Sequence, residues 1–380
     1  MITRQFAYRA FWTASSLAFL VCAVALVRDT RYQGQDFEVF WKAAKYLTQA
    51  QPLYSLPRDG AMIFKYPPWI ATLFIPFSWF SIESAKWIWG AVEVMSLLGV
   101  VRWVLAQTKN PLWVVLVTLS FWGVWAVHAL DGQISLVILF LALWAEEKGR
   151  FTADAAAHIA LSTKIFPWLA VIGLGKRAFR MKTLSLAALM VIILSIPALL
   201  SEPGHSVVEL LKNWKDAAVS GAAVFGEAKI FGRENQGLPA LTGRLFPETR
   251  AWGETWLFAL WALPLYTLWG FVSRRLDRAT RFSGWLALAA CTHPLAWFHS
   301  FVFSFPAASL AVEKSVESKR PALIFASLFG VLAIVAMTAK TAGLMGETLE
   351  FYSGKSLGSL ICLGVLVLVA PGKHHPKFRR

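Results

Sequence analysis

Polar side chains capable of acid–base or phosphate chemistry occur as five short clusters in an otherwise apolar chain. A carboxylate can accept a proton from a hydroxyl, Lys and Arg bind phosphate oxygens, and amides bond to sugar hydroxyls. The clusters therefore suit proton transfer beside an anionic, hydroxyl-bearing ligand. In chain order they are Asp36 with Lys65 and Tyr66, then His128 with Asp131 and Gln133, then Lys164, then Arg233 with Asn235, Gln236 and Arg244, and last His293 with His299.

Asp36 precedes a stretch with helical periodicity, in which Phe37, Phe40 and Ala44 fall on one face and Lys42 and Lys45 on another. This spacing predicts an amphipathic helix lying on the outer membrane surface. Asp36 stands where a helix N-cap belongs, so capping is an alternative to a chemical role. The two roles are compatible, because a carboxylate at a helix start can also face a cavity.

Lys164 lies within the apolar segment 151–175. An intramembrane lysine costs roughly 3 kcal/mol on insertion scales unless it pairs or binds an anion. Snorkelling is one alternative, but Pro167 predicts a helix break here, which favours an anionic partner such as a lipid phosphate. For Asp131 and Gly132 the alternative is an ordinary turn.

The last two clusters have ordinary alternatives as well. Isolated Arg, Asn and Gln residues in the segment 201–250 would be typical of any polar loop. A single His in a membrane helix is usually a packing residue that forms hydrogen bonds. His293 and His299 flank Pro294 and Trp297, however, and intramembrane ionisable groups are commonly functional.

The composition predicts the elements that must position these residues. Of 380 residues, 57% are apolar and 16% charged, and the mean hydropathy is +0.54. Soluble domains carry roughly 25% charged residues. Apolar runs at 183–200, 256–272 and 321–338 approach the roughly 20 residues that cross a bilayer as a helix. With few alternating strand patterns, the prediction is an all-α polytopic membrane protein that forms one domain over 1–380.

The net charge of +15 does not indicate nucleic-acid binding, because the basic residues fall in short loops between apolar segments. There they meet anionic lipid and mark the cytoplasmic side. The three cysteines have no metal-ligand spacing and are interpreted as packing residues. The predicted cytoplasmic segments are 4–9, 146–150, 176–182, 274–281, 314–320 and 373–380, and the cysteines are Cys22, Cys291 and Cys362.

This charge pattern predicts about 12 crossings with both termini in the cytoplasm. The segment 11–27 is interpreted as an uncleaved first membrane helix and not as a signal peptide. Two further apolar segments, 151–175 and 282–312, are predicted to be broken helices, which are tolerated where they line a cavity. The segments predicted to lie outside are 28–66, 129–133, 201–250, 293–299 and 339–355. All five polar clusters then face one side, which favours a single cavity.

The order of the motifs resembles glycosyltransferase family 87 of the GT-C superfamily, which comprises bacterial and mycobacterial mannosyltransferases that use polyprenyl-phosphate-mannose. The similarity runs in order from residue 36 to about 303, most of the chain. It is carried by DFEVFWKAAKYL, QPLY, FKYPPW, DGQISL, TKIFPW, ENQGLPALTGRL and HPLAWFHSF. The chain departs from the family pattern at Asp131 in place of Asn, at Gly237 in place of Ser and at Ser300 in place of a second His.

The resemblance implies a GT-C bundle in the bacterial inner membrane, with the site on the outer face. It also implies an inverting displacement in which Asp36 acts as general base. His299 and His293 would steady the base or bind phosphate, with His299 placed at the base and His293 at the phosphate. The implied phosphate ligands also include Lys164, Arg233 and Arg244. The implied sugar or acceptor ligands are Lys65, Tyr66, His128, Asp131, Gln133, Asn235 and Gln236.

The implied partners are membrane lipid, a polyprenyl-phosphate sugar and a lipid or glycolipid acceptor, with no nucleic acid. No metal or cofactor is expected, since the outer segments carry no Asp-x-Asp pair and the chain has no segment typical of a nucleotide-binding domain. A lipid or solute transporter, or flippase, is the main alternative, because such proteins also have broken helices and buried ionisable groups. Transport would require polar residues that open to both sides. A noncatalytic subunit and a ligase acting on lipid-linked glycans are further alternatives.

Overall fold

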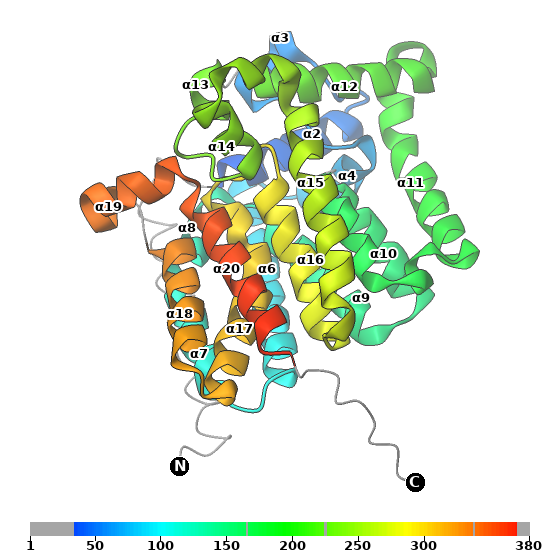
Figure 1. Ribbon diagram of the computed structural model, residues 1–380. Coiled ribbons are helices and arrows are strands. Elements are labelled where there is room, and N and C mark those ends of the chain that lie inside the picture. Colours follow the sequence, from blue (N-terminus) through cyan, green and yellow to red (C-terminus); the bar gives the residue numbers. More distant parts are fainter. Residues whose placement is uncertain (1–33, 165, 224–225, 337–338, 371–380) are drawn as a thin grey trace. The chain divides into compact units, whose positions relative to one another are not determined.

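The computed structural model describes residues 34–164, 166–223, 226–336 and 339–370, and every element in these ranges is a helix (Figure 1). This confirms the predicted all-α class for the described residues. Some predictions concern residues outside the described ranges. These are the first crossing expected at 11–27, Cys22, and the basic segments 4–9 and 373–380. The chain divides into two compact units, which are described separately. The single domain expected over 1–380 stays a prediction.

The amino-terminal unit comprises 34–100 and 125–232 of the described residues. Helix α6 leaves this unit after Val100, and α8 enters it at Trp125. Its helices are α2 (Gln35–Thr48), α3 (Leu56–Asp59), η1 (Gly60–Met62), α4 (Pro68–Leu73), α5 (Ile75–Ser78), α6 (Ile82–Ala106), α8 (Trp122–Asp131), α9 (Ser135–Lys148), α10 (Phe151–Ser162), η2 (Phe166–Leu174), η3 (Lys176–Phe179), α11 (Met181–Ser201), η4 (Pro203–His205), α12 (Val207–Ala223) and α13 (Gly226–Ile230).

The apolar stripe of α2 packs inside the amino-terminal unit. Phe37 and Phe40 are fully buried. Phe37 stacks on Trp89 of α6 with ring centroids 5.5 Å apart, and Phe40 stacks on Phe74 at 4.5 Å. Aromatic side chains bury large apolar areas, so these contacts hold α2 firmly against α6 and the α4–α5 turn. That α2 also lies at the membrane surface stays a prediction.

The segment 151–175 consists of two helices separated by a break, as its Lys and Pro residues predict. Helix α10 ends at Ser162 and the 3₁₀ helix η2 begins at Phe166. Pro167 lies in the first turn of η2, where a missing N–H leaves no helical bond unmade. In contrast, the segment 201–250, expected as a long loop, contains the helices α12, α13 and α14 among its described residues.

The carboxy-terminal unit comprises 101–124 and 233–370 of the described residues. The predicted break in 282–312 is present, because α16 ends at Thr292 and η7 begins at Phe298. The helices of this unit are α7 (Pro111–Ser120), α14 (Leu238–Leu245), η5 (Pro247–Trp252), α15 (Gly253–Val272), η6 (Ser273–Arg275), α16 (Arg278–Thr292), η7 (Phe298–Ser304), α17 (Phe305–Ser318), α18 (Pro321–Val335), α19 (Ala339–Phe351) and α20 (Gly354–Leu368).

Glycines allow α18 and α20 to approach closely. A Cβ atom at Gly358 would lie 2.5 Å from the carbonyl oxygen of Gly330, and one at Gly330 would lie 2.8 Å from Cys362 Sγ. Small residues at such contacts are typical of helices packed in membranes. Cys291 and Cys362 are both buried and free, which agrees with a packing role.

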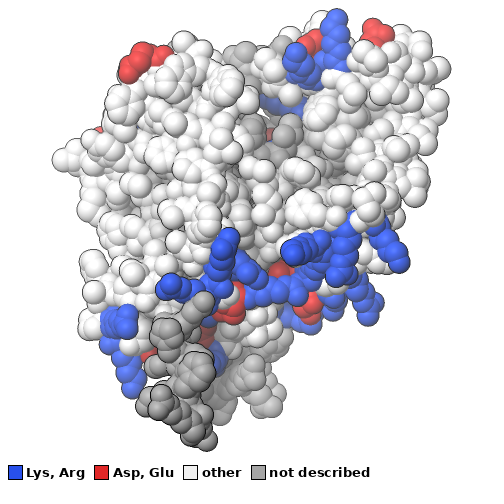
Figure 2. Space-filling view, turned by 45° about the vertical axis from the view of Figure 1, so that its right-hand side comes forward, with Lys and Arg blue, Asp and Glu red and all other residues white. Residues whose placement is uncertain are grey.

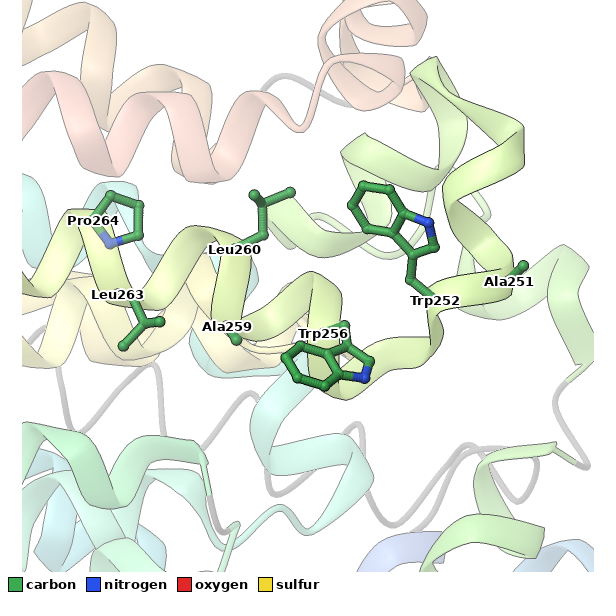
Figure 3. A pocket seen from close by; sticks show the side chains of 7 residues that line it. All are labelled: Ala251, Trp252, Trp256, Ala259, Leu260, Leu263 and Pro264. Carbon is green, nitrogen blue, oxygen red and sulfur yellow. The ribbon is translucent and has the colours of Figure 1, made fainter.

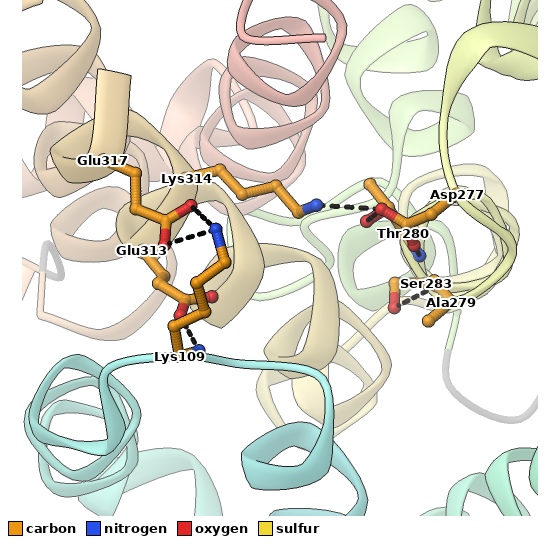
Figure 4. A network of polar contacts seen from close by, with 8 residues as sticks. All are labelled: Lys109, Asp277, Ala279, Thr280, Ser283, Glu313, Lys314 and Glu317. Carbon is orange, nitrogen blue, oxygen red and sulfur yellow. Dashed lines mark hydrogen bonds and ion pairs between the residues drawn. The ribbon is translucent and has the colours of Figure 1, made fainter. Parts of the chain in front are cut away.

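Two of the segments predicted to be cytoplasmic lie side by side in the carboxy-terminal unit (Figure 4). Lys314 bonds to Asp277 at 2.8 Å, and Asp277 caps α16 by accepting from the backbone N–H of Thr280 at 2.8 Å. Nearby, Glu313 accepts the backbone N–H groups of Lys109 and Asn110. These contacts join α17 to the starts of α16 and α7.

By length and composition, three helical segments are long and apolar enough to cross a membrane, or up to five if each bent pair counts as one span. The described residues therefore do not confirm about 12 crossings. The three are Ile82–Ala106, Met181–Ser201 and Pro247–Arg275, and the bent pairs are Pro111–Ser120 with Trp122–Asp131 and Ala342–Phe351 with Gly354–Leu368. The face in Figure 2 has broad areas without charged side chains, as expected of a membrane protein.

The start of α15 carries an open apolar groove of about 730 Å³ on the carboxy-terminal unit (Figure 3). It is lined by Ala251, Trp252, Trp256, Ala259, Leu260, Leu263 and Pro264. Since this helix belongs to a candidate span, the groove provides an apolar surface suited to hydrocarbon chains.

Candidate functional site

Asp36 lies in the first turn of α2 and does not cap the helix. The N-cap residue is Gly34, whose φ of 63° and ψ of 37° are left-handed, so the capping interpretation of Asp36 is wrong. The buried ring of the adjacent Phe37 fixes this turn. The carboxylate of Asp36 instead accepts a hydrogen bond from the side-chain amide of Gln133, which follows the end of α8.

The turn between α8 and α9 brings Gln133 to Asp36. The backbone N–H of Gly34 donates to the carbonyl of Leu130 at 2.7 Å, which ties the start of α2 to this turn. Gly132 has φ +66°, and a Cβ atom there would lie 2.7 Å from Phe37 Cβ. The glycine in the DGQ motif therefore permits both the left-handed turn and the close approach of α2.

We expect Gly132→Ala to destabilise the protein by about 2–4 kcal/mol, because it combines left-handed backbone strain with an overpacked contact. The midpoint of thermal unfolding in detergent measures the loss. Gly204→Ala is the control, because Gly204 also has a positive φ (+72°, with ψ 2°) but no heavy atom lies within 4 Å of the added Cβ. Equal losses in the two variants would rule out the contact with Phe37 as a cause.

Gln133 joins the carboxylate of Asp36 to the ammonium group of Lys164. Its Nε2 donates to Asp36 Oδ2, and its Oε1 accepts from Lys164 Nζ at 3.1 Å. Gln133 is only 3% exposed. An amide can donate to a carboxylate through its nitrogen and accept from an ammonium through its oxygen at the same time, so its two partners determine its orientation.

Lys164 reaches this position because the chain breaks between α10 and η2. Thr163, the C-cap residue of α10, is buried, and its hydroxyl donates to the carbonyl of Ile159 at 3.3 Å. The lysine ammonium thus leaves the helix end and bonds to Gln133. Asp36 and Asp131 both interact electrostatically with Lys164, and the predicted binding of a lipid phosphate stays a prediction.

Lys65 and Tyr66 complete the amino-terminal part of the site. Burial lowers the pKa of Lys65 to about 8, although nearby Asp36 opposes this shift. Burial and the charge of Asp36 both raise the pKa of Tyr66. Burial likewise raises the pKa of Asp36, while Lys164 and Lys65 oppose the rise. A partly desolvated carboxylate with a raised pKa is a better base than an exposed one.

His128 is fully buried, and both of its ring nitrogens have protein partners. Nε2 accepts from the backbone N–H of Leu136 at 2.9 Å, and Nδ1 lies 3.0 Å from Glu93 Oε1. The sugar-binding role of His128 stays a prediction. Glu93 was not identified from the sequence, although it is the single charged residue in the apolar run 87–101, and that isolation was the available signal.

In the carboxy-terminal unit, Asn235 and Gln236 form a buried junction between loops. Asn235 Oδ1 accepts from the backbone N–H groups of Gly237 and Ala296 at 3.1 and 3.0 Å. Gln236 Nε2 donates to the carbonyl of Glu350 at 2.8 Å. These bonds give both amides a structural function, and their binding of sugar stays a prediction.

The two arginines differ in their surroundings. Arg244 is anchored, donating to the carbonyls of Phe351 and Asn235 at 2.9 and 2.8 Å and to Ser353 Oγ at 2.6 Å. Arg233 is 56% exposed and lies 3.8 Å from Glu347. Phosphate binding by both arginines stays a prediction.

His293 and His299 flank the break between α16 and η7. His293 Nδ1 accepts from the backbone N–H of Leu295 at 3.0 Å, which stabilises the turn. His299 is buried, and its ring lies 6.3 Å from that of Trp297. The described structure thus brings three polar clusters together in the amino-terminal unit and two in the carboxy-terminal unit. The single cavity for all five stays a prediction.

The described residues contain no group of three His, Cys, Asp or Glu side chains arranged to hold a metal ion. The sequence model of the family described as glycosyltransferase family 87 matches residues 64–304, more than half of the chain. Comparison with curated proteins and with solved structures gave no match. The matched range includes all the candidate residues except Asp36.

Proposed function

The chain belongs to glycosyltransferase family 87, and from this we propose that it transfers a hexose, specifically mannose, from a polyprenyl-phosphate carrier to a lipid or glycolipid acceptor. We place the reaction on the outer face of the bacterial inner membrane, with both chain termini in the cytoplasm. The observation that carries the proposal is the arrangement of Asp36, Gln133 and Lys164, which supplies a base and a cation beside one another.

The reaction is a single displacement at the anomeric carbon. An acceptor hydroxyl forms the new C–O bond as the bond from that carbon to the phosphate oxygen breaks. Asp36 takes the proton of the hydroxyl, and the phosphate leaves with the bonding electron pair. Lys164 stabilises the charge that develops on the phosphate. One displacement inverts the configuration, so a β-linked donor gives an α-linked product.

The neutral amide of Gln133 leaves both charged groups free to act on the substrates in this reaction. A direct bond between Asp36 and Lys164 would occupy the carboxylate with a strong cationic donor and hold it away from the acceptor. Gln133 instead gives each charged group a neutral partner. The carboxylate keeps lone pairs for the hydroxyl, and the ammonium keeps N–H donors for phosphate oxygens.

The remaining residues fit supporting functions in the proposal. Lys65, Tyr66 and Asp131 lie close enough to Asp36 to interact with it electrostatically, which supports contact with the sugar or the acceptor. His299 is proposed to assist the base and His293 the phosphate. Phosphate binding by Arg233 and Arg244 and sugar binding by Asn235 and Gln236 are proposed as the motifs predict. His128 faces protein groups with both ring nitrogens, which supports a structural role.

The test is transfer of radiolabelled mannose from polyprenyl-phosphate-mannose to total membrane lipids by the purified protein. Labelled lipid that depends on the protein supports both the donor and the reaction. Transfer from another polyprenyl-linked sugar, such as a pentose, would keep the reaction and overturn the sugar. No transfer from any lipid-linked sugar would overturn the proposal and favour the transporter alternative.

We expect kcat/KM for transfer to depend on pH in a bell shape. Asp36 acts as a base only when ionised, so activity rises as the pH passes upward through its raised pKa. Lys65 is cationic below its pKa of about 8, so activity falls above that pH as its ammonium loses a proton. Lys65→Arg should move the alkaline limb to higher pH, because guanidinium stays protonated. An alkaline limb that does not move would exclude Lys65.

A further inference from the structure

Glu93 is a buried carboxyl group that the proposed reaction does not use. It lies within α6, one of the helices long and apolar enough to cross a membrane, and is 4% exposed. Ionisable side chains in such helices are costly and persist where they have a partner and a function. The partner here is His128, which is 1% exposed and whose Nδ1 lies 3.0 Å from Glu93 Oε1.

The hydrogen bond on the other side of the ring determines where His128 carries its proton. Nε2 accepts from the backbone N–H of Leu136, so it has no proton of its own. The proton of the neutral ring must then be on Nδ1, which lies 3.0 Å from Glu93 Oε1. The Leu136 N–H thus selects the tautomer, and the buried carboxyl group faces the protonated nitrogen.

His128 accepts two hydrogen bonds at the turn that carries Gln133, one through its backbone carbonyl and one through its ring. Its backbone carbonyl accepts from the N–H of Gln133 at 3.1 Å. Its ring accepts from Leu136 N–H, one of the donors in the first turn of α9 that have no partner within the helix. With the ring rotated, Leu136 would lose its acceptor and the turn would lose its attachment to α9.

A second bond from the same face of α6 reaches the same turn. Trp89 lies one helical turn before Glu93, and residues four apart share a helix face. Its indole N–H donates to the carbonyl of Gly132 at 3.2 Å, while its ring stacks on Phe37 of α2. Trp89 and Glu93 therefore contact the turn at two points, Gly132 and His128, both of which precede Gln133 in the sequence.

We propose that Glu93 is a positioning residue that, through His128, locks the α8–α9 turn and so places the Gln133 amide between Asp36 and Lys164. The functional part of this inference rests on the proposed sugar transfer. Glu93 does not touch the reacting groups. Its contribution is to keep Gln133 in the one orientation that serves both the base and the cation.

The transfer activity of three variants on α6 tests whether Glu93 positions the α8–α9 turn, the arrangement called the lock below. Glu93→Leu removes the carboxyl group that lies against His128 but suits an apolar helix, so we expect insertion to be retained and kcat for transfer to fall about 100-fold, the effect of a misplaced catalytic group. Glu93→Gln keeps a polar oxygen beside Nδ1 and should stay within about fivefold of the parent. Ser96→Ala is the control, since Ser96 is buried on α6 and its hydroxyl donates to the carbonyl of Val92 in the same helix at 2.8 Å. Parent-like activity in Glu93→Leu, or an equal loss in Glu93→Gln, would overturn the lock.

Ring ¹⁵N chemical shifts of the protein labelled with [¹⁵N]histidine test the lock without any transfer assay. The His128 signals are those that disappear in His128→Asn. We expect protonated Nδ1 and unprotonated Nε2 in the parent and in Glu93→Gln, and a changed pattern in Glu93→Leu. The parent pattern retained in Glu93→Leu would overturn the inference. The expected shifts in a protein that transfers no sugar would support the lock and overturn the proposed function.

Discussion

Replacing Asp36 with Asn is expected to lower the rate of mannose transfer about a thousandfold while leaving the protein folded. The amide has the size of the carboxylate and can still accept from Gln133, but it cannot take a proton from the acceptor hydroxyl. Transfer of radiolabel from polyprenyl-phosphate-mannose measures the rate, and thermal unfolding in detergent measures the fold.

Glu38→Gln is the matched control for Asp36. Glu38 lies two residues later on α2, where its side chain is 37% exposed and pairs with Lys42 at 2.8 Å. Exposed ion pairs contribute little, so this variant should transfer sugar at the rate of the parent. Full activity in Asp36→Asn would remove the base from the mechanism and favour a noncatalytic subunit. Loss of folded protein in Asp36→Asn would show that the carboxylate has a structural function.

Replacing Lys164 with Met is expected to lower kcat/KM about 100-fold by removing the cation that stabilises the leaving phosphate. The apolar stem of the side chain is kept, so the surroundings of the break between α10 and η2 stay filled. Donor affinity is measured best in the Asp36→Asn background, because labelled polyprenyl-phosphate-mannose then binds without being consumed.

Lys42→Met provides the comparison for Lys164. The Lys42 side chain is 48% exposed on α2, so its removal takes away one positive charge without touching the site. We expect donor affinity to fall in Lys164→Met and to stay unchanged in Lys42→Met. Equal affinity in the two variants would place the donor phosphate elsewhere, with the two arginines of the carboxy-terminal unit as the next candidates.

The sequence predicted the helical class, the breaks near Lys164 and Pro294, and one cavity for all five polar clusters, three of which the structure brings together around Asp36, Gln133 and Lys164. These features leave clear signals, because charged residues and prolines within apolar runs are costly unless the fold accommodates them. The number of crossings was harder to predict. An apolar run reports only its length and composition, whereas α7 and α8 are bent by 53° at a break that no proline or charge marks.

Other features of the structure left weaker signals in the sequence. The amides of Asn235 and Gln236 have the same donors and acceptors whether they bind a sugar or a backbone, so the sequence could not predict that both are bonded to backbone groups. Asp36 was given a possible capping function because residue type alone does not reveal where a helix begins. Glu93 was missed because its partner His128 is remote in sequence and no local motif joins them.

The geometry of the DGQ turn also has a consequence for how such sequences can diverge. At Gly132 any side chain meets both a left-handed backbone and the Cβ of Phe37. Selection for a folded protein should therefore remove replacements there whatever sugar is used. Asp131 is half-buried and close enough to Asp36 and Lys164 to interact with both electrostatically. A replacement at position 131 would therefore change the charge beside the proposed base while leaving unaltered the glycine that the turn requires.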